Sequence, residues 1–121
     1  MQPVNWFEIP VSDLARAQAF YERVFGVELA PNEMGGLKMA WFPMAPGSAG
    51  ASGALVKGEG YTPSYAGTMV YFTVESIEAA LMRVIAGGGR MITPRMSIGV
   101  YGFVAHFEDC EGNRVALHAM Q

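Results

Sequence analysis

The sequence of 121 residues predicts an α+β domain built from two tandem βαβββ modules. Residues 7–26 align without gaps with residues 70–89, so that Val11 matches Val74 and Gly26 matches Gly89. Each stretch reads as a short apolar strand, a polar turn, an amphipathic helix and a closing glycine, and short strands follow each helix. This duplication predicts two modules related by a pseudo-twofold axis, and the groove between them is where a ligand site is expected.

The first module is predicted over residues 1–57. Its opening strand covers about 3–10. Ser12 or Asp13 then caps a helix over 14–25, which ends at Gly26. Its apolar face at helical spacing consists of Leu14, Ala17, Tyr21 and Val24. Further short strands are expected at 27–32, 38–44 and 53–57, with a flexible loop of small residues before the last of them.

The second module is predicted over residues 68–121, after a linker at 58–67 that is rich in Gly, Pro and Ser. It begins with a strand over 68–74. A helix over about 76–86 follows and ends at three consecutive glycines. Further strands are expected at 90–93, 102–108 and 113–119. The segment TPRMSIGVYGF (93–103) contains two glycines and is expected to act as a lid, or else its glycines only shape a turn.

Charge, hydropathy and cysteine content limit the partners, the location and the disulfide bonds expected for this chain. A net charge of −3 and a pI near 5.3, with no cluster of Lys or Arg, exclude a nucleic-acid partner. No apolar run approaches the ~18 residues that a membrane span requires. The first residues lack the layout of a signal peptide, so a cytoplasmic location is expected. A single cysteine, Cys110, excludes an internal disulfide.

Alternation along the strands assigns side chains to two faces. Phe7 and Ile9, together with Asn5, form the more apolar set of the first strand, so Trp6 and Glu8 point the opposite way. The same argument applied to three strands of the second module brings both histidines to that face. The predicted concave face therefore carries Trp6, Glu8, Met69, Tyr71, His106, Ala116 and His118.

Two stretches resemble the motifs of a known superfamily. IPVSDLARAQAFYERVFG (9–26) and GGGRMITPRMSIGVYGFVAHFEDCEGNRVALH (87–118) are similar to the opening and closing motifs of the vicinal-oxygen-chelate superfamily. This superfamily contains glyoxalase I, bleomycin-resistance proteins and extradiol dioxygenases. DCEGN stands where DPEGN is usual. The resemblance implies paired βαβββ modules in a cup-shaped mixed sheet, and commonly a homodimer.

The resemblance also implies where a metal would be held. Metal-bearing members supply one ligand from the first and last strand of each module, and these positions fall at Trp6, Ala54, Met69 and Ala116. Tryptophan, alanine and methionine cannot supply the oxygen or imidazole ligands that Zn²⁺, Ni²⁺, Mn²⁺ or Fe²⁺ would require here. No metal ligand and no cofactor are therefore predicted.

The favoured function is a metal-independent, small-molecule-binding protein of the glyoxalase or bleomycin-resistance type. A small hydrophobic or aromatic ligand is expected in the cleft between modules. Its predicted binding residues are Trp6, Met69, Tyr71 and Tyr101, whose side chains can stack on or pack against a flat ligand.

Glu8, His106 and His118 are the candidate catalytic residues, and three interpretations of them stay open. They form a hydrogen-bonded polar cluster, a general base with an acid in metal-free chemistry, or a displaced metal site. The last corresponds to the alternative function, a metal-dependent lyase, isomerase or dioxygenase. A third alternative is an accessory subunit whose cleft is filled by its own side chains. Whether the protein is an enzyme is left open.

Overall fold

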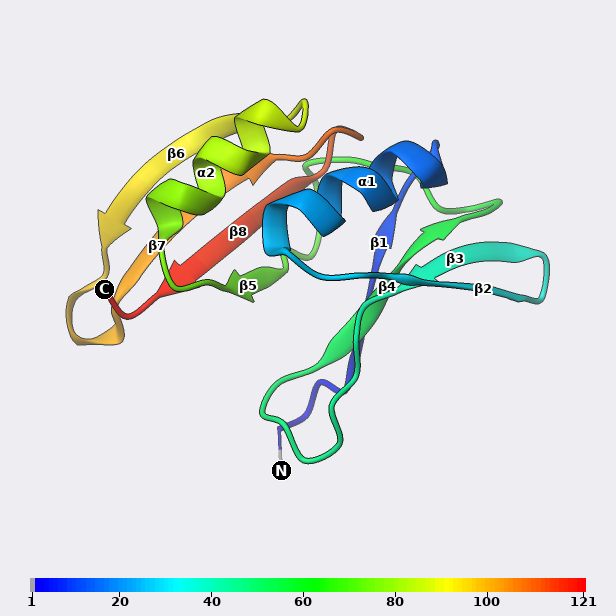
Figure 1. The fold of residues 1–121 in the computed structure, drawn as a ribbon, viewed down its shortest axis with the longest axis horizontal. Helices are drawn as coiled ribbons and strands as arrows, with labels where there is room; N and C mark the ends of the chain where they lie inside the picture. Colours follow the sequence, from blue (N-terminus) through cyan, green and yellow to red (C-terminus); the bar gives the residue numbers. More distant parts are fainter. Residues whose placement is uncertain (1) are drawn as a thin grey trace.

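The two modules form the arms of an arch, with both helices on its outer side and the sheets below them (Figure 1). The computed structural model describes residues 2–121. Neither of its helices has the length and hydropathy that crossing a bilayer would need. The elements are β1 (Trp6–Pro10), α1 (Leu14–Phe25), β2 (Ala30–Met34), β3 (Leu37–Trp41), β4 (Ser52–Lys57), β5 (Tyr71–Thr73), α2 (Ile77–Ala86), β6 (Arg90–Ser97), the 3-10 turn Gly99–Tyr101, β7 (Phe103–Glu108) and β8 (Arg114–Ala119).

Each module forms its own four-stranded mixed sheet, in the orders β1-β4-β3-β2 and β5-β8-β7-β6. The first strand of each pairs in parallel with the last, and the other pairings are antiparallel. The registers are equivalent, since Glu8 lies opposite Ala54 and Tyr71 lies opposite Ala116. This confirms the predicted α+β fold with two tandem βαβββ modules.

Several strand limits differ from the predicted ones because the hydrogen-bonding partners differ. The predicted strand at 27–32 begins only at Ala30. The backbone of Leu29 is bound by side chains of α1 instead: its N–H donates to Glu22 (2.8 Å) and its carbonyl accepts from Gln18 (3.2 Å). β1 begins at Trp6, where pairing with β4 starts, rather than at residue 3. Asn5, expected on the apolar face, is exposed.

In the second module, β6 is longer than predicted and β5 is shorter. β6 continues to Ser97 through Pro94, which is tolerated because β6 is an edge strand with irregular pairing to β7 alone. The first residues of the predicted lid at 93–103 are thus part of a strand. β5, predicted over 68–74, pairs with β8 only over Tyr71–Thr73.

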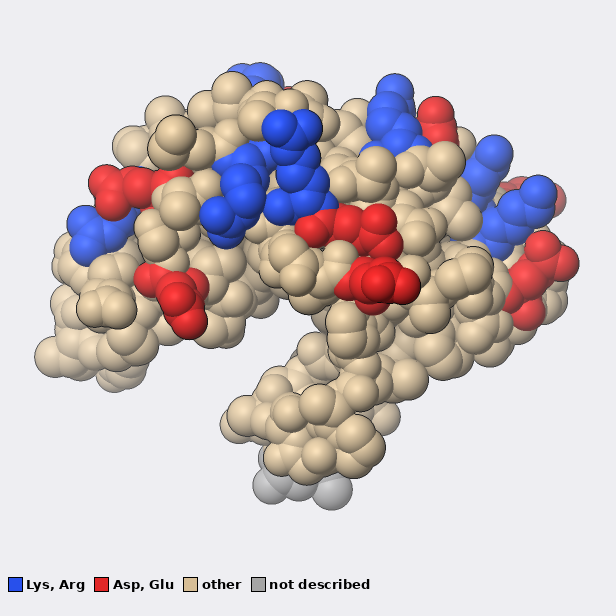
Figure 2. Space-filling view, viewed as in Figure 1, with Lys and Arg blue, Asp and Glu red and all other residues tan. Residues whose placement is uncertain are grey.

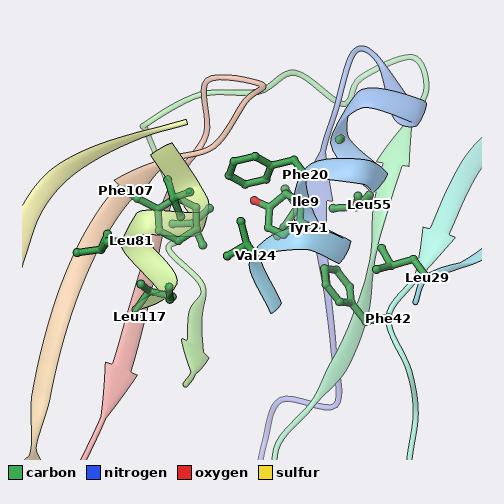
Figure 3. Packing of buried hydrophobic residues seen from close by; sticks show 14 of the residues in the cluster. Ile9, Phe20, Tyr21, Val24, Leu29, Phe42, Leu55, Leu81, Phe107 and Leu117 are labelled. Atoms are coloured by element: carbon green, nitrogen blue, oxygen red, sulfur yellow. The ribbon is translucent and has the colours of Figure 1, made fainter. Parts of the chain in front are cut away.

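The main core lies between the helices and the sheets. Tyr21 and Val24 of α1 pack with Phe107 and Leu117 of the second sheet, so one apolar cluster serves both modules (Figure 3). The helices begin as predicted: the Asp13 side chain accepts a hydrogen bond from the N–H of Arg16, and Ser76 does the same for α2.

Aromatic rings join the two modules at the lower part of the core. The Phe72 ring of β5 stacks on Phe25 with centroids 4.3 Å apart and meets Phe7 of β1 edge-on at 5.6 Å. It also lies 5.6 Å from Phe42 and 6.1 Å from Tyr21. Such ring pairs add to the burial of apolar area, so Phe72 anchors β5 to the first module.

The turn between β7 and β8 ties the second module to the first through buried hydrogen bonds. Tyr21 donates its hydroxyl proton to Asp109 Oδ2 at 2.6 Å, and the amides of Glu111 and Asn113 donate to Asp109 Oδ1. The Asn113 side chain donates to the carbonyl of Pro10 at 2.8 Å. Burial, together with the adjacent Asp109 carboxylate, raises the pKa of Tyr21 well above its usual range. Tyr21 is therefore a permanent donor.

Glu111 of the same turn binds the start of α1. Its carboxylate accepts hydrogen bonds from the N–H and hydroxyl of Ser12 and from the N–H of Asp13. Arg16 completes the site with two guanidinium hydrogen bonds, at 3.0 and 2.6 Å. Burial opposes ionisation of Glu111, but the donors from Ser12, Arg16 and Asp13 outweigh it and lower the pKa of the carboxyl group.

We expect Tyr21→Phe to lower the free energy of unfolding by about 1–2 kcal/mol, because it leaves the buried Asp109 carboxylate without one donor. Urea denaturation followed by circular dichroism measures this loss. Tyr101→Phe is the matched control: Tyr101 is exposed, and its loss of a hydroxyl should change stability by no more than about 0.5 kcal/mol. Equal effects of the two variants would contradict the role given to Tyr21.

We expect Glu111→Gln to destabilise the protein by about 1–2 kcal/mol at neutral pH, with the difference from the unsubstituted protein shrinking in acid. Because the folded-state pKa is lowered, the carboxylate stabilises the fold above its unfolded value of 4.5 and loses this effect as pH falls through the folded-state pKa. Denaturation curves at several pH values test this. The control Glu33→Gln lies at an exposed position on β2. Its difference in free energy of unfolding from the unsubstituted protein should not shrink in acid.

Candidate functional site

A cleft of about 1220 Å³ lies between the two modules. Its walls come from β1, from the segment containing β5, from the loop after β3 and from the first turns of α2. Figure 2 shows the notch that opens between the two arms, with mostly uncharged surface on either side. The volume suits a ligand of several rings.

Four of the predicted site residues line this cleft, namely Trp6, Glu8, Met69 and Tyr71. Alternation assigns all four to one face, but Phe7, Val70, Phe72 and Val74, which it assigns to the opposite face, line the cleft as well. The cleft also includes residues that alternation could not find, because they come from helices and loops: Phe25 and Arg83 from the helices, and Phe42 and Ala51 from the loop region.

Glu8 is held by two neutral donors. Trp6 Nε1 donates to Glu8 Oε2 at 3.3 Å, and the hydroxyl of Tyr61 donates to Glu8 Oε1 at 3.0 Å. The hydrogen bond to this carboxylate, and then its charge, raise the pKa of Tyr61. Tyr61 lies in the linker between modules, where no periodic pattern indicated a role.

The concave face of the first sheet is largely covered by its own side chains. The Trp6 and Trp41 rings meet edge-on with centroids 5.2 Å apart. Beside them, Tyr61 packs over the buried side chains of Met39 and Val56. This small second core fixes the orientation of Trp6 at the cleft wall.

A smaller cavity of about 550 Å³ lies on the concave face of the second sheet. Met96 and Ile98, from the end of β6 and the segment after it, cover it on one side, and His106 and His118 face it from β7 and β8. Tyr71 and Thr73 line both cavities. β5 is therefore the wall that the two cavities share.

The histidines make separate contacts in this cavity. His106 Nε2 lies 3.5 Å from the hydroxyl of Tyr71, and the two rings meet edge-on. Burial, and then the charge of Arg114, lower the pKa of His106, which favours the neutral imidazole at pH 7. His118 Nε2 donates to the backbone carbonyl of Tyr101 at 2.6 Å, which ties the turn after β6 to β8.

The structure therefore separates the three candidate catalytic residues. Glu8 bonds to Trp6 and Tyr61 in the larger cleft, whereas His106 and His118 line the smaller cavity. Within residues 2–121, no three His, Cys, Asp or Glu side chains gather as a metal site would require. Tyr101, a predicted binding residue, has 73% of its surface exposed and lines neither cavity.

The positions implied as metal ligands carry no suitable donors. Ala54 and Ala116 are 0% exposed and present only methyl groups, and they lie opposite Glu8 and Tyr71 in equivalent registers. Trp6 uses its only polar atom as a donor to Glu8. The side chains at these positions therefore cannot coordinate the metal ion that metal-bearing members of the similar superfamily hold.

The arrangement can bind an apolar ring system and offer it a few polar groups. Glu8 supplies a hydrogen-bond acceptor, and Tyr71 with neutral His106 supplies a metal-free pair that could exchange a proton with a ligand. Cys110 is not part of either cavity. Burial, together with the nearby Asp109 and Glu111, raises the pKa of its thiol to about 11, which leaves it a poor nucleophile.

Several known proteins are similar to this chain in sequence or in structure. The chain is 27% identical to the putative glyoxylase CFP32 of Mycobacterium tuberculosis over 93% of its own length, but it spans only 44% of that protein. A glyoxylase/bleomycin resistance protein/dioxygenase domain from Frankia sp. EAN1pec superposes with a TM-score of 0.75, covering 100% of this chain and 99% of that one at 17% identity.

TnmS3, an antibiotic binding protein from Streptomyces sp. CB03234, is 25% identical, with a TM-score of 0.71 over 98% of this chain and 96% of that one. The model of one protein family matches residues 4–117, nearly the whole chain. This match agrees with the paired βαβββ modules and with the resemblance of the motifs at 9–26 and 87–118. The chain belongs to the Glyoxalase/Bleomycin resistance protein/Dioxygenase superfamily.

Proposed function

We propose that this protein binds a small aromatic or hydrophobic molecule in the cleft between its modules, without a metal ion. The observation that carries the proposal is the cleft of about 1220 Å³, which brings Trp6, Met69 and Tyr71 to its walls. An open concave site lined by aromatic and apolar side chains, with a few polar groups, is typical of small-molecule sites. The likeness to the antibiotic binding protein TnmS3 supports binding as the activity.

The chemistry of the side chains supports a metal-free site. The positions that hold the metal ligands in metal-bearing superfamily members carry a tryptophan, a methionine and two alanines here. Glu8 lies in a different cavity from His106 and His118. The alternative, a metal-dependent lyase, isomerase or dioxygenase, would need these residues to move together. Tyr71 lines both cavities, so a ligand in the cleft can extend past it into the smaller cavity. Tyr71 and His106 would then exchange a proton with that ligand.

We expect aromatic fragments to bind in the cleft and to shift the indole N–H signal of Trp6 in two-dimensional NMR spectra, while that of Trp41 moves less. Trp6 lines the cleft, whereas Trp41 does not and its Nε1 is buried. Trp6→Ala should weaken such binding by about tenfold. Met82→Ala, on the exposed side of α2, is the control and should leave binding unchanged. A broad fragment screen without any cleft binder would contradict the proposed function.

We expect protein that has been incubated with Zn²⁺, Ni²⁺, Mn²⁺ or Fe²⁺ and then dialysed to retain far less than one metal ion per chain. The positions equivalent to metal ligands offer no imidazole or carboxylate. Elemental analysis of the dialysed protein measures this. Stoichiometric metal that is lost in both Glu8→Ala and His118→Ala would instead establish the displaced site.

A further inference from the structure

Among residues 2–121, the Glu8 carboxylate forms no ion pair with a cationic side chain. Its two hydrogen bonds come from Trp6 and Tyr61, which are neutral donors. The two ion pairs among residues 2–121 are Arg16 with Glu111 and Arg90 with Glu108, both outside the cleft.

The rest of the cleft does not neutralise this charge. Its other charged lining residues are Glu75, which is also acidic, and Arg83. The Arg83 Nε–H donates to the carbonyl of Val24 at 2.8 Å, which directs the guanidinium toward the end of α1. Two carboxylates therefore line the cleft for one guanidinium.

An aromatic side chain stands beside the free charge. Trp6 lines the cleft, donates to Glu8 and is held in place by its edge-on contact with Trp41. Cations are attracted to the face of an indole ring, and an ammonium group can also donate to a carboxylate. Met69 and Tyr71 supply apolar and aromatic surface in the same cleft.

We propose that the cleft selects ligands that combine an aromatic body with a protonated amine, with the ammonium group at Glu8 and Trp6. This rests on the proposed function and names the class of ligand for the same site. The apolar body packs against Met69 and Tyr71, and the ammonium supplies the positive charge that no side chain of residues 2–121 provides to Glu8 in an ion pair. The carboxylate is solvent-accessible, so the expected selectivity is moderate, about five- to tenfold.

Three naphthalene derivatives of similar size and different charge test the selection. 2-Naphthylmethylamine is a cation at pH 7, 2-naphthalenemethanol is neutral, and 2-naphthoic acid is an anion. Dissociation constants come from NMR titrations that follow the amide signals of cleft residues. The amine should bind about five- to tenfold more tightly than the alcohol, and the acid more weakly than both. Equal affinities of amine and alcohol would overturn the proposal.

Two variants separate a local effect from a general one. Glu8→Gln should bring the ratio of amine to alcohol affinity close to one. Glu33→Gln changes the net charge by the same amount at an exposed position on β2 and should keep the ratio. A similar fall in both variants would show a nonspecific effect of net charge and would overturn the role of Glu8.

The unsubstituted protein gives a second measurement that does not depend on how Glu8→Gln folds. Raising the salt concentration from about 0.01 M to about 1 M shortens the Debye length from about 30 Å to about 3 Å. The ratio of amine to alcohol affinity should fall as the salt concentration rises. A ratio that salt does not change would contradict an ion pair at Glu8.

The outcomes distinguish this inference from the proposed function. If the alcohol binds in the cleft as tightly as the amine, the binding function stands and the charge selection fails. If the naphthalene series does not bind but a fragment screen finds cleft binders, cationic fragments must be enriched among them. If neither the series nor the screen gives a cleft binder, the proposed function itself fails.

Discussion

The short turn between β7 and β8 holds the two modules at a fixed angle, and the cleft depends on this. Asp109 receives the hydroxyl of Tyr21, Asn113 reaches the carbonyl of Pro10, and Glu111 binds the N-terminal end of α1. Each contact joins an element of the second module to one of the first. A buried carboxylate with several donors is costly to disrupt, so the turn acts as a rigid connection between the arms of the arch.

The same turn explains why a motif at the end of the chain accompanies one at the beginning. Ser12, Asp13 and Arg16 belong to the opening motif, and Asp109 and Glu111 belong to the closing one. Ser12, the Asp13 N–H and Arg16 donate to Glu111, and Tyr21 of the opening motif donates to Asp109. The motifs therefore report how the modules are joined, which is a property of the fold, and they carry little information about the ligand.

Duplication produces two equivalent sheets with different concave faces. In the first sheet Glu8 lies opposite Ala54, and in the second sheet Tyr71 lies opposite Ala116 at the equivalent register position. In the first sheet, Trp41 and Tyr61 cover the face, and in the second sheet a cavity of about 550 Å³ stays open. The asymmetry leaves Glu8 and Trp6 at the edge of the larger cleft, where a ligand can reach both.

The sequence by itself determined the fold, the helix limits at Leu14–Phe25 and the common face on which Tyr71 and the two histidines lie. Helical and strand periodicity are local properties, so they can be recognised without tertiary contacts. Only the tertiary structure decided that Glu8 bonds to Tyr61 of the linker and lies apart from His106 and His118. Alternation assigns a face but no distance along it, because distances depend on sheet curvature and on how the modules pack.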